Sequence, residues 1–263
     1  MPNADTRLLA VADVSKRFGG VMALDRVSLA IGARDIFGLI GPNGAGKTTL
    51  FNAISGLYRI DSGDIRLNGL ALAGASPYAV ARAGLARTFQ NIRLFANMTA
   101  LENVMVGRHV RTRTGVVGAI FRHAAARSEE RQTRERARAL LDYVGIAPLA
   151  ERLAKHLSYG DQRRLEIARA LATEPKLLAL DEPAAGMNAK EREGLQAMLL
   201  RIRADGVAVL LIEHDVKLVM QLCDRIAVLD HGEKIAEGSP AEVTRDPKVI
   251  AAYLGDDASG APV

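Results

Sequence analysis

The sequence predicts an α/β fold with a mostly parallel sheet, and two observations lead to this prediction. First, apolar strand-like runs at residues 177–181, 207–212 and 226–229 alternate with helical patterns. Strands that alternate with helices favour a parallel sheet with helices on both faces. Second, the pattern G-x-x-x-x-G-K-[ST] of a phosphate-binding loop occupies residues 41–48. It joins the apolar run 36–40 to the start of a helix, which is the strand–loop–helix context that such a loop requires.

Further strand-like segments flank this loop. Residues 8–14 and 27–31 are apolar runs that precede it. Residues 64–69 have the pattern of a strand that ends in a turn, and residues 86–89 have that of a short strand ending at Gln90. We therefore expect the first half of the core to end near residue 90.

The segment from residue 91 to about residue 157 has a different character, with little strand signal. Its clearest pattern is an amphipathic helix whose apolar positions follow the spacing i, i+3, i+4, i+7. These positions are Ala137, Leu140, Leu141 and Val144. Residues 115–118 contain two glycines and break the segment into helical pieces. We interpret it as a helical insertion between two halves of one α/β core.

The resulting organisation is a single domain over residues 1–263. Its α/β core comprises residues 1–90 and 173–237, and the helical subdomain comprises residues 91–172. A C-terminal extension covers residues 238–263, with two short helical pieces and a disordered-looking end from residue 256. Within the second core half, an amphipathic helix is marked by Leu195, Met198, Leu199 and Ile202.

The phosphate-binding loop defines the first part of a nucleotide site. Its glycines let backbone N–H groups wrap around phosphate oxygens, and the following helix adds its positive N-terminal end. Lys47 is expected to place its charge between the β- and γ-phosphates, and Thr48 to offer a hydroxyl to Mg²⁺. The predicted binding residues of this loop are Gly41, Asn43, Gly44, Ala45, Gly46, Lys47, Thr48 and Thr49.

An acidic pair follows the apolar strand at residues 177–181. Asp181 ends that strand, where it is placed to hold Mg²⁺ through water. Glu182 comes one residue later and can orient or deprotonate an attacking water. The alternative is a strand followed by surface acids, and the upstream phosphate-binding loop favours the catalytic interpretation.

The composition of the chain indicates in which cellular compartment the protein is expected. The 263 residues are 49% hydrophobic and contain one cysteine, which excludes a disulfide framework. Cys223 lies in an apolar helical stretch, so we expect a buried structural thiol. The first residues lack the basic start and apolar stretch of a signal peptide, and no apolar run is long enough to span a bilayer. We therefore expect a cytoplasmic protein that does not itself cross the membrane.

The net charge of +5 is concentrated in one segment. Between Arg108 and Arg138 there are nine Arg and three Glu residues. A solvated helix is the simpler interpretation, and attraction to anionic lipid or an acidic partner is the alternative. Trp is absent and aromatic residues make up 4%, so we expect no nucleic-acid partner.

A helix start at residues 157–162 (Leu-Ser-Tyr-Gly-Asp-Gln) places Ser158 and the Gly160 N–H where an anion is favoured. This hexapeptide resembles the signature motif L-S-G-G-Q-Q of the ATP-binding cassette (ABC) ATPases. Tyr159 and Asp161 depart from that motif, whereas Ser158, Gly160 and Gln162 keep it. No other phosphate-loop class combines such a motif with an acidic pair about twenty residues later.

The resemblance implies a P-loop NTPase (RecA-like) core with an ABC-specific antiparallel β region and an inserted α-helical subdomain. It implies ATP and Mg²⁺ as cofactors. Gln90 resembles the glutamine that links core and insertion and reaches Mg²⁺ and water. His214 resembles the switch histidine that touches the γ-phosphate. Phe18 stands where the family has an aromatic residue stacked on adenine, with a strand core residue as the alternative.

In this family two subunits face each other head to tail, and the loop at residues 184–188 crosses their interface. Each nucleotide then lies between the phosphate-binding loop of one subunit and the signature motif of the other. Ser158 and Gly160 therefore serve the partner's ATP. Closure on ATP and opening after hydrolysis is a ligand-driven population shift that moves attached membrane subunits.

Finer similarities indicate one subgroup. The strings at residues 87–91, 159–169, 184–188, 212–215 and 252–255 resemble the ATPase subunits of bacterial branched-chain amino-acid importers. The resemblance implies membrane permeases, a second ATPase subunit and, indirectly, a substrate-binding protein as partners, and a place on the inner face of the membrane.

Other classes fit less well. Urea importer and lipopolysaccharide-export ATPases share several strings, but the long basic insertion argues against the export group. A soluble ABC ATPase of DNA repair or translation would bring a coiled coil, a zinc hook or a second cassette. A nucleotide kinase or GTPase would leave residues 158–162 and His214 without a role.

Overall fold

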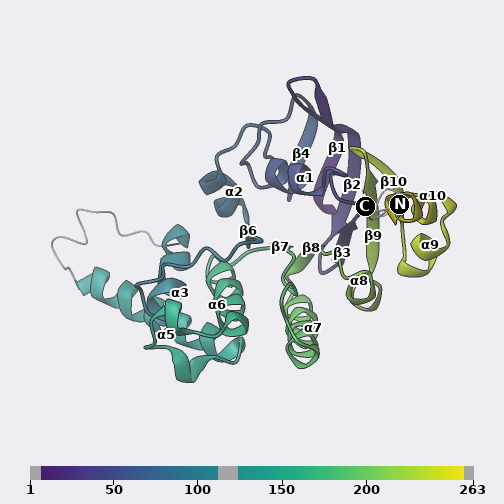
Figure 1. The fold of residues 1–263 in the computed structure, drawn as a ribbon. Helices are drawn as coiled ribbons and strands as arrows, with labels where there is room; N and C mark the ends of the chain where they lie inside the picture. Colours follow the sequence, from purple (N-terminus) through teal and green to yellow (C-terminus); the bar gives the residue numbers. More distant parts are fainter. Residues whose placement is uncertain (1–6, 112–123, 258–263) are drawn as a thin grey trace. The chain divides into compact units, whose positions relative to one another are not determined.

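The computed structural model describes residues 7–111 and 124–257, and it divides into two compact units (Figure 1). Unit 1 consists of Met1–Leu85 and Lys176–Val263, and unit 2 of Ala86–Pro175. The chain therefore leaves the first unit once, forms the second, and returns to complete the first.

Unit 1 contains an antiparallel sheet in the order β2-β1-β4-β5. Its strands are β1 (Arg7–Phe18), β2 (Val21–Gly32), β4 (Ser62–Leu67) and β5 (Leu70–Ala71). The predicted strands at residues 8–14 and 27–31 were too short. The ladder continues through polar residues to the Phe18–Val21 pair, because backbone hydrogen bonds maintain it beyond the apolar runs.

The second sheet has the order β10-β9-β3-β8-β7-β6. Its strands are β3 (Ile36–Ile40), β6 (Leu85–Arg87), β7 (Leu177–Asp181), β8 (Ala208–Ile212), β9 (Arg225–Asp230) and β10 (Glu233–Gly238). Strand β3 pairs in parallel with β8 and β9, and β7 pairs in parallel with β8. The predicted parallel sheet is confirmed. Strand β10 was not predicted, because charged residues make up half of its six positions and leave no apolar run. It pairs antiparallel with β9.

Helices of unit 1 follow the strands as the alternation predicted. They are α1 (Lys47–Ile54), α2 (Pro77–Ala83), α7 (Ala189–Ala204), α8 (Val216–Leu222), α9 (Pro240–Arg245) and α10 (Pro247–Asp257). The apolar face predicted for α7 is buried at all four positions. Cys223 follows α8 and is buried, as expected, and burial raises the pKa of its thiol to about 12.

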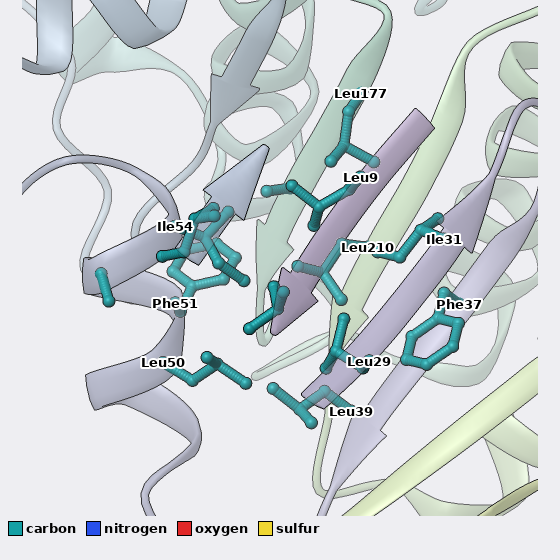
Figure 2. Close-up of a cluster of buried hydrophobic side chains, with 14 of the residues drawn as sticks. Leu9, Leu29, Ile31, Phe37, Leu39, Leu50, Phe51, Ile54, Leu177 and Leu210 are labelled. Atoms are coloured by element: carbon teal, nitrogen blue, oxygen red, sulfur yellow. The ribbon is translucent and has the colours of Figure 1, made fainter. Parts of the chain in front are cut away.

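The core of unit 1 joins both sheets to the helix that follows the phosphate-binding loop (Figure 2). Leu50, Phe51 and Ile54 of α1 belong to one buried cluster with side chains of β1, β2, β3 and β8. Each fully buried side chain of this size contributes about 1.5–3 kcal/mol relative to an exposed one. This packing holds the first turn of α1, and so the loop before it, in place.

Unit 2 is helical in its described part. Its elements are α3 (Ala100–Arg108), η2 (His109–Arg111), α5 (Ala124–Tyr143), η3 (Ala147–Leu149), η4 (Ala154–His156) and α6 (Tyr159–Leu171). The four predicted apolar positions are 0–5% exposed; three of them lie in α5, and Val144 directly follows its end, so the buried helix face is confirmed. The predicted break at residues 115–118 lies outside the described residues, as does part of the basic segment.

One predicted element of this region was too long. Strand β6 ends at Arg87, so Thr88 and Phe89 lie beyond it. The N–H and C=O of Phe89 bond to Glu166 and Arg163 side chains, so side chains here take the place of strand partners. Among residues 91–111 and 124–157, the only β structure is an isolated bridge between Thr99 and Leu153, in line with the weak strand signal.

A search of the described helices for an 18-residue apolar stretch that could cross a membrane finds none.

Candidate nucleotide-binding site

The predicted site residues of unit 1 that follow β3, β7 and β8 all start from one edge of the parallel sheet. The register aligns Leu39 of β3 and Asp181 of β7 with Ile212 of β8. The chain runs from β3 to β7, and β8 then inserts between them, so the strand order has a switch at this point. The crevice beyond such a switch is where open α/β sheets bind ligands. The loops that follow β3, β7 and β8 all start at this edge.

The phosphate-binding loop after β3 depends on glycine for two different reasons. At Gly41 (φ 149°), an added Cβ would lie 2.0 Å from the Leu229 carbonyl oxygen, so the fold leaves no room for a side chain. At Gly44 (φ 79°), an added Cβ would meet no atom within 4 Å. The loop is thus packed against β9 at its start and open at its middle, where a phosphate needs room.

Lys47 is the first residue of α1 and is 6% exposed. Its ammonium donates to the carbonyl oxygens of Gly41 (2.6 Å) and Pro42 (2.7 Å), which curls the side chain back over the loop. Helix α1 has no acidic residue in its first turn, so the positive end of its dipole is not neutralised there. The loop therefore combines a fixed cation with a helix N-terminus.

Two segments far along the chain brace this loop. The Gly232 N–H, in the turn between β9 and β10, donates to the Ala45 carbonyl at 3.1 Å, and the Asp25 N–H donates to the Gly232 carbonyl at 2.8 Å. From α10, the Tyr253 hydroxyl accepts the Gly41 N–H; burial raises the Tyr253 pKa, and this bond partly opposes the shift. Helix α10 therefore contacts the first glycine of the phosphate-binding loop.

Glu182 and His214 meet at the same sheet edge. The His214 Nε2 lies 2.7 Å from the Glu182 Oε1, with the imidazole half exposed and the carboxylate 17% exposed. Glu182 has a positive φ of 47°, a conformation that costs about 1–3 kcal/mol for such a residue and is concentrated at functional sites. Asp181, one residue earlier, is 5% exposed. Two of the side chains assigned to hydrolysis, Glu182 and His214, therefore come together.

Glu213 is a site-edge residue to which the sequence assigned no role. It is 4% exposed, and its Oε1 accepts the Ala184 N–H at 2.8 Å. Burial raises the pKa of this carboxyl, and the Ala184 hydrogen bond partly opposes that shift. Glu213 thus ties the end of β8 to the loop at residues 184–188. Its position directly after an apolar strand, beside His214, was the available signal.

Phe18 ends β1, and its side chain is 45% exposed. The alternative interpretation as a strand core residue is therefore wrong. Its ring makes an edge-to-face contact with Tyr58, at 5.3 Å between centroids, and the Lys16 ammonium lies 5.3 Å from its centroid. An exposed ring held by its neighbours offers a face for a flat apolar ligand.

The remaining predicted site residues belong to unit 2. Ser158 caps α6, accepting the Asp161 N–H at 3.2 Å and donating to the Asp161 carboxylate at 2.7 Å. Gly160 is buried in the first turn, and the Gln162 amide donates to the Leu157 carbonyl at 3.0 Å. Asp161, a departure from the family motif, therefore bonds to the serine of that motif. Gln90 is exposed in the loop that follows β6.

The residues present fit a nucleotide and a magnesium ion. The open middle of the loop, the N-terminus of α1 and the Lys47 ammonium together suit a polyphosphate. Thr48 and Asp181 supply a hydroxyl and a carboxylate, which are the oxygen donors that magnesium takes alongside phosphate oxygens.

Comparison with known families agrees with this geometry. The family model described as ABC transporter matches residues 24–185. The model described as branched-chain amino acid ATP-binding cassette transporter matches residues 233–259, which include β10, α9 and Tyr253.

Curated relatives extend the agreement to nearly the whole chain. The high-affinity branched-chain amino acid transport ATP-binding protein BraF of Pseudomonas aeruginosa is 45% identical over 250 residues, covering 95% of this chain and 98% of BraF. LivG of Salmonella typhimurium and LivG of Escherichia coli, described in the same words, are 46% and 44% identical with the same coverage.

Solved structures match the fold. The ADP conformation of MJ1267, an ATP-binding cassette of an ABC transporter, has a TM-score of 0.82 and 33% identity, covering 95% of this chain and 99% of that one. A dimeric post-hydrolysis state of the ATP-binding cassette MJ0796 bound to ADP and Pi has a TM-score of 0.75 and 26% identity, covering 88% and 98%. On the family match and these identities, the chain belongs to the ATP-binding cassette family and is an ABC transporter ATPase with the P-loop NTPase fold.

Proposed function

We propose that this protein is the ATP-hydrolysing subunit that powers import of branched-chain amino acids through a membrane ABC transporter. The observation that supports it most is the 44–46% identity to LivG and BraF proteins over 95% of the chain. The match of residues 233–259 to a branched-chain amino-acid cassette model supports it independently of the shared nucleotide-binding motifs. A urea, amide or other importer is the second candidate.

In the proposed site, the phosphate-binding loop from Gly41 to Thr49 holds the polyphosphate and Lys47 neutralises it. Phe18 stacks on the adenine. Glu182 orients and deprotonates the attacking water, and His214, which contacts Glu182 at 2.7 Å, touches the γ-phosphate. The exposed Phe18 ring and the short Glu182–His214 contact support these roles.

Mg²⁺ belongs to the proposal as a second cofactor. Thr48, Asp181 and Gln90 are the residues that hold it. When bound with the nucleotide, it neutralises charge on the phosphate oxygens. Asp181 is buried at the end of a strand and carries carboxylate oxygens that can coordinate a metal ion, which supports its assignment as a magnesium ligand.

The proposed active unit is a head-to-tail pair of ATPase subunits. Ser158, Gly160 and Gln162 act on the nucleotide bound to the partner subunit, at the N-terminus of α6. The dimeric MJ0796 cassette, which resembles this chain, supports a dimer. A homodimer and a heterodimer with a sister ATPase both fit.

We further propose one ABC ATPase domain over residues 1–263. It has an α/β core at residues 1–90 and 173–237, a helical subdomain at residues 91–172 and a C-terminal extension at residues 238–263. The protein works on the cytoplasmic face of the cell membrane, attached to permease subunits and serving a substrate-binding protein indirectly, with no nucleic-acid partner.

The test is to isolate the protein from native membranes in mild detergent and identify what accompanies it. Two polytopic membrane proteins, with or without a second small ATPase, support an importer. Reconstituting that complex with radiolabelled leucine or urea then separates the two cargo candidates. Recovery of DNA or ribosomes without a membrane partner contradicts the transport proposal and leaves the ATPase chemistry intact.

A further inference from the structure

A buried ion pair lies on α6, the helix that begins at the signature motif. Arg163 and Glu166 are 3% and 1% exposed, and the Arg163 Nη1 lies 3.3 Å from the Glu166 Oε2. Residues three positions apart share a helix face, which brings these side chains together. A buried pair survives the cost of desolvation only when further hydrogen bonds satisfy both partners. The other partners of the pair therefore show what it holds.

Arg163 directs its remaining donors at the loop that carries Gln90. Its Nη1 donates to the Phe89 carbonyl at 2.8 Å, and its Nη2 donates to the Gln90 carbonyl. Nη2 and Nε also donate to the Tyr159 hydroxyl, at 2.9 and 3.2 Å. One guanidinium thus joins two successive carbonyl groups of the loop to the first turn of α6.

Glu166 holds the same loop from the acceptor side. Its Oε1 accepts the N–H groups of Phe89 and Arg93, both at 3.4 Å. Burial raises the pKa of Glu166, and the Arg163 charge opposes that shift. Residues 88–93 belong to no helix or strand, so these two side chains satisfy backbone groups that secondary structure would otherwise pair.

The loop is also closed on itself. The guanidinium groups of Arg87 and Arg93 lie 4.4 and 4.1 Å from the centroid of the Phe89 ring. These two cation–π contacts restrain the ring. The segment from Arg87 to Arg93 is therefore a compact unit that the Arg163–Glu166 pair attaches to α6.

We infer that the Arg163–Glu166 pair is a positioning device that ties the Gln90 backbone to the signature helix, so that Gln90 and Ser158 move as one body. Neither side chain touches substrate; both act through Gln90. This inference rests on the proposed role of Gln90 toward Mg²⁺ and water.

The first experiment removes both buried charges together, because removing one leaves the other unpaired and destabilises the fold. In the full chain, Arg163→Met with Glu166→Leu should lower kcat for ATP about tenfold while KM for ATP stays within about twofold. Arg164→Met is the control for replacing an arginine of α6 by methionine, at a neighbouring position that is half-buried. It should retain the parental kcat.

A double-mutant cycle with Gln90→Ala separates positioning from general damage. Gln90→Ala alone should lower kcat; a parental kcat there contradicts the proposed role of Gln90. In the Gln90→Ala background, the Arg163→Met/Glu166→Leu change should have no further effect on kcat, because its target is already gone. A parental kcat in the pair variant alone, or losses that multiply in the combined variant, overturns the positioning device.

One further measurement does not depend on that variant folding. Hydrogen exchange on the unmodified protein should show the Phe89 and Arg93 amides protected like the first turns of α6. Exchange at the rate of an exposed loop overturns the inference whatever Gln90 does.

Discussion

The His214 Nε2 lies 2.7 Å from the Glu182 Oε1, so two side chains from different strand ends form one polar pair at the edge of the parallel sheet. The register between β7 and β8 creates this contact. Asp181 and Ile212 are paired at the end of the ladder, so Glu182 and His214, which follow them, start from the same edge of the sheet. His214 is thereby oriented by the carboxylate that we propose as the general base.

Glu182→Gln should bind ATP but hydrolyse it at least about 100-fold more slowly, because an amide cannot accept the proton of the attacking water. ATP should then trap a dimer, which size-exclusion chromatography with nucleotide detects. His214→Ala in the Glu182→Gln background should lower turnover little further. His156→Ala, at an exposed histidine of unit 2, is the control. Parental turnover in Glu182→Gln would remove Glu182 as the base.

Lys47→Ala should reduce ATP turnover about 100-fold or more, since it removes the only side-chain charge assigned to the polyphosphate. The substitution also frees the Gly41 and Pro42 carbonyls that the ammonium now joins. Equilibrium binding of a fluorescent ATP analogue, measured beside turnover, tests both effects. Lys190→Ala, at an exposed lysine, makes the same charge change and should be neutral. Parental ATP turnover in Lys47→Ala would contradict the assignment of residues 41–48 as a phosphate-binding loop.

Ser158→Arg should spare nucleotide binding by the monomer and stop hydrolysis, because Ser158 serves the nucleotide of the partner in the proposed dimer. It also removes a helix cap, which costs about 1 kcal/mol. Ser76→Arg removes the comparable cap of α2 and is the matched control for that loss. Turnover that is unchanged in Ser158→Arg, or reduced equally in both variants, argues against a composite site.

Glu213→Gln should stabilise the protein in a pH-dependent way. A buried carboxyl with a raised pKa holds its proton longer in the folded state, so the stability of the parent falls as pH rises from the ordinary value, 4.5, through the raised one. Glutamine keeps the oxygen that accepts the Ala184 N–H and has no such proton. Its advantage in unfolding free energy should be smallest below that window and reach about 1 kcal/mol above it.

Urea denaturation of parent and variant across that pH series measures the difference. Glu193→Gln, at an exposed carboxylate, is the matched control for replacing a glutamate by glutamine. A Glu213→Gln advantage that is constant with pH, or that shrinks as pH rises, contradicts the assignment.

Tyr253→Phe should weaken ATP binding about two- to tenfold, because the hydroxyl that accepts the Gly41 N–H is lost and a hydrogen bond is worth roughly 0.5–1.5 kcal/mol. Titration with a fluorescent ATP analogue gives the change in Kd. Tyr78→Phe, at a tyrosine that is 58% exposed, is the control. Equal affinities for Tyr253→Phe and the parent would show that the Tyr253 hydroxyl does not affect nucleotide binding by the loop.

Local chemistry made much of the fold predictable. The strands at residues 36–40 and 177–181 were predicted to the residue because they are fully buried and therefore continuously apolar. Prediction from apolar runs was wrong for β1 and β2, because their backbone hydrogen bonds continue beyond the apolar residues. It missed β10, an edge strand with charged residues. Phe89 was assigned to a short strand at residues 86–89, whereas the Arg163 and Glu166 side chains bond to its backbone groups.

The sequence by itself determined the family, the phosphate-binding loop and the order of the acidic, glutamine and histidine motifs, because each is a short pattern of residue types whose chemistry is readable without partners. Only the tertiary structure decided which distant groups meet: His214 with Glu182, Gly232 with Ala45, Tyr253 with Gly41, and Arg163 with the Gln90 carbonyl. These contacts arise from strand register and helix packing, which depend on the summed burial of many side chains across the whole chain rather than on any local pattern.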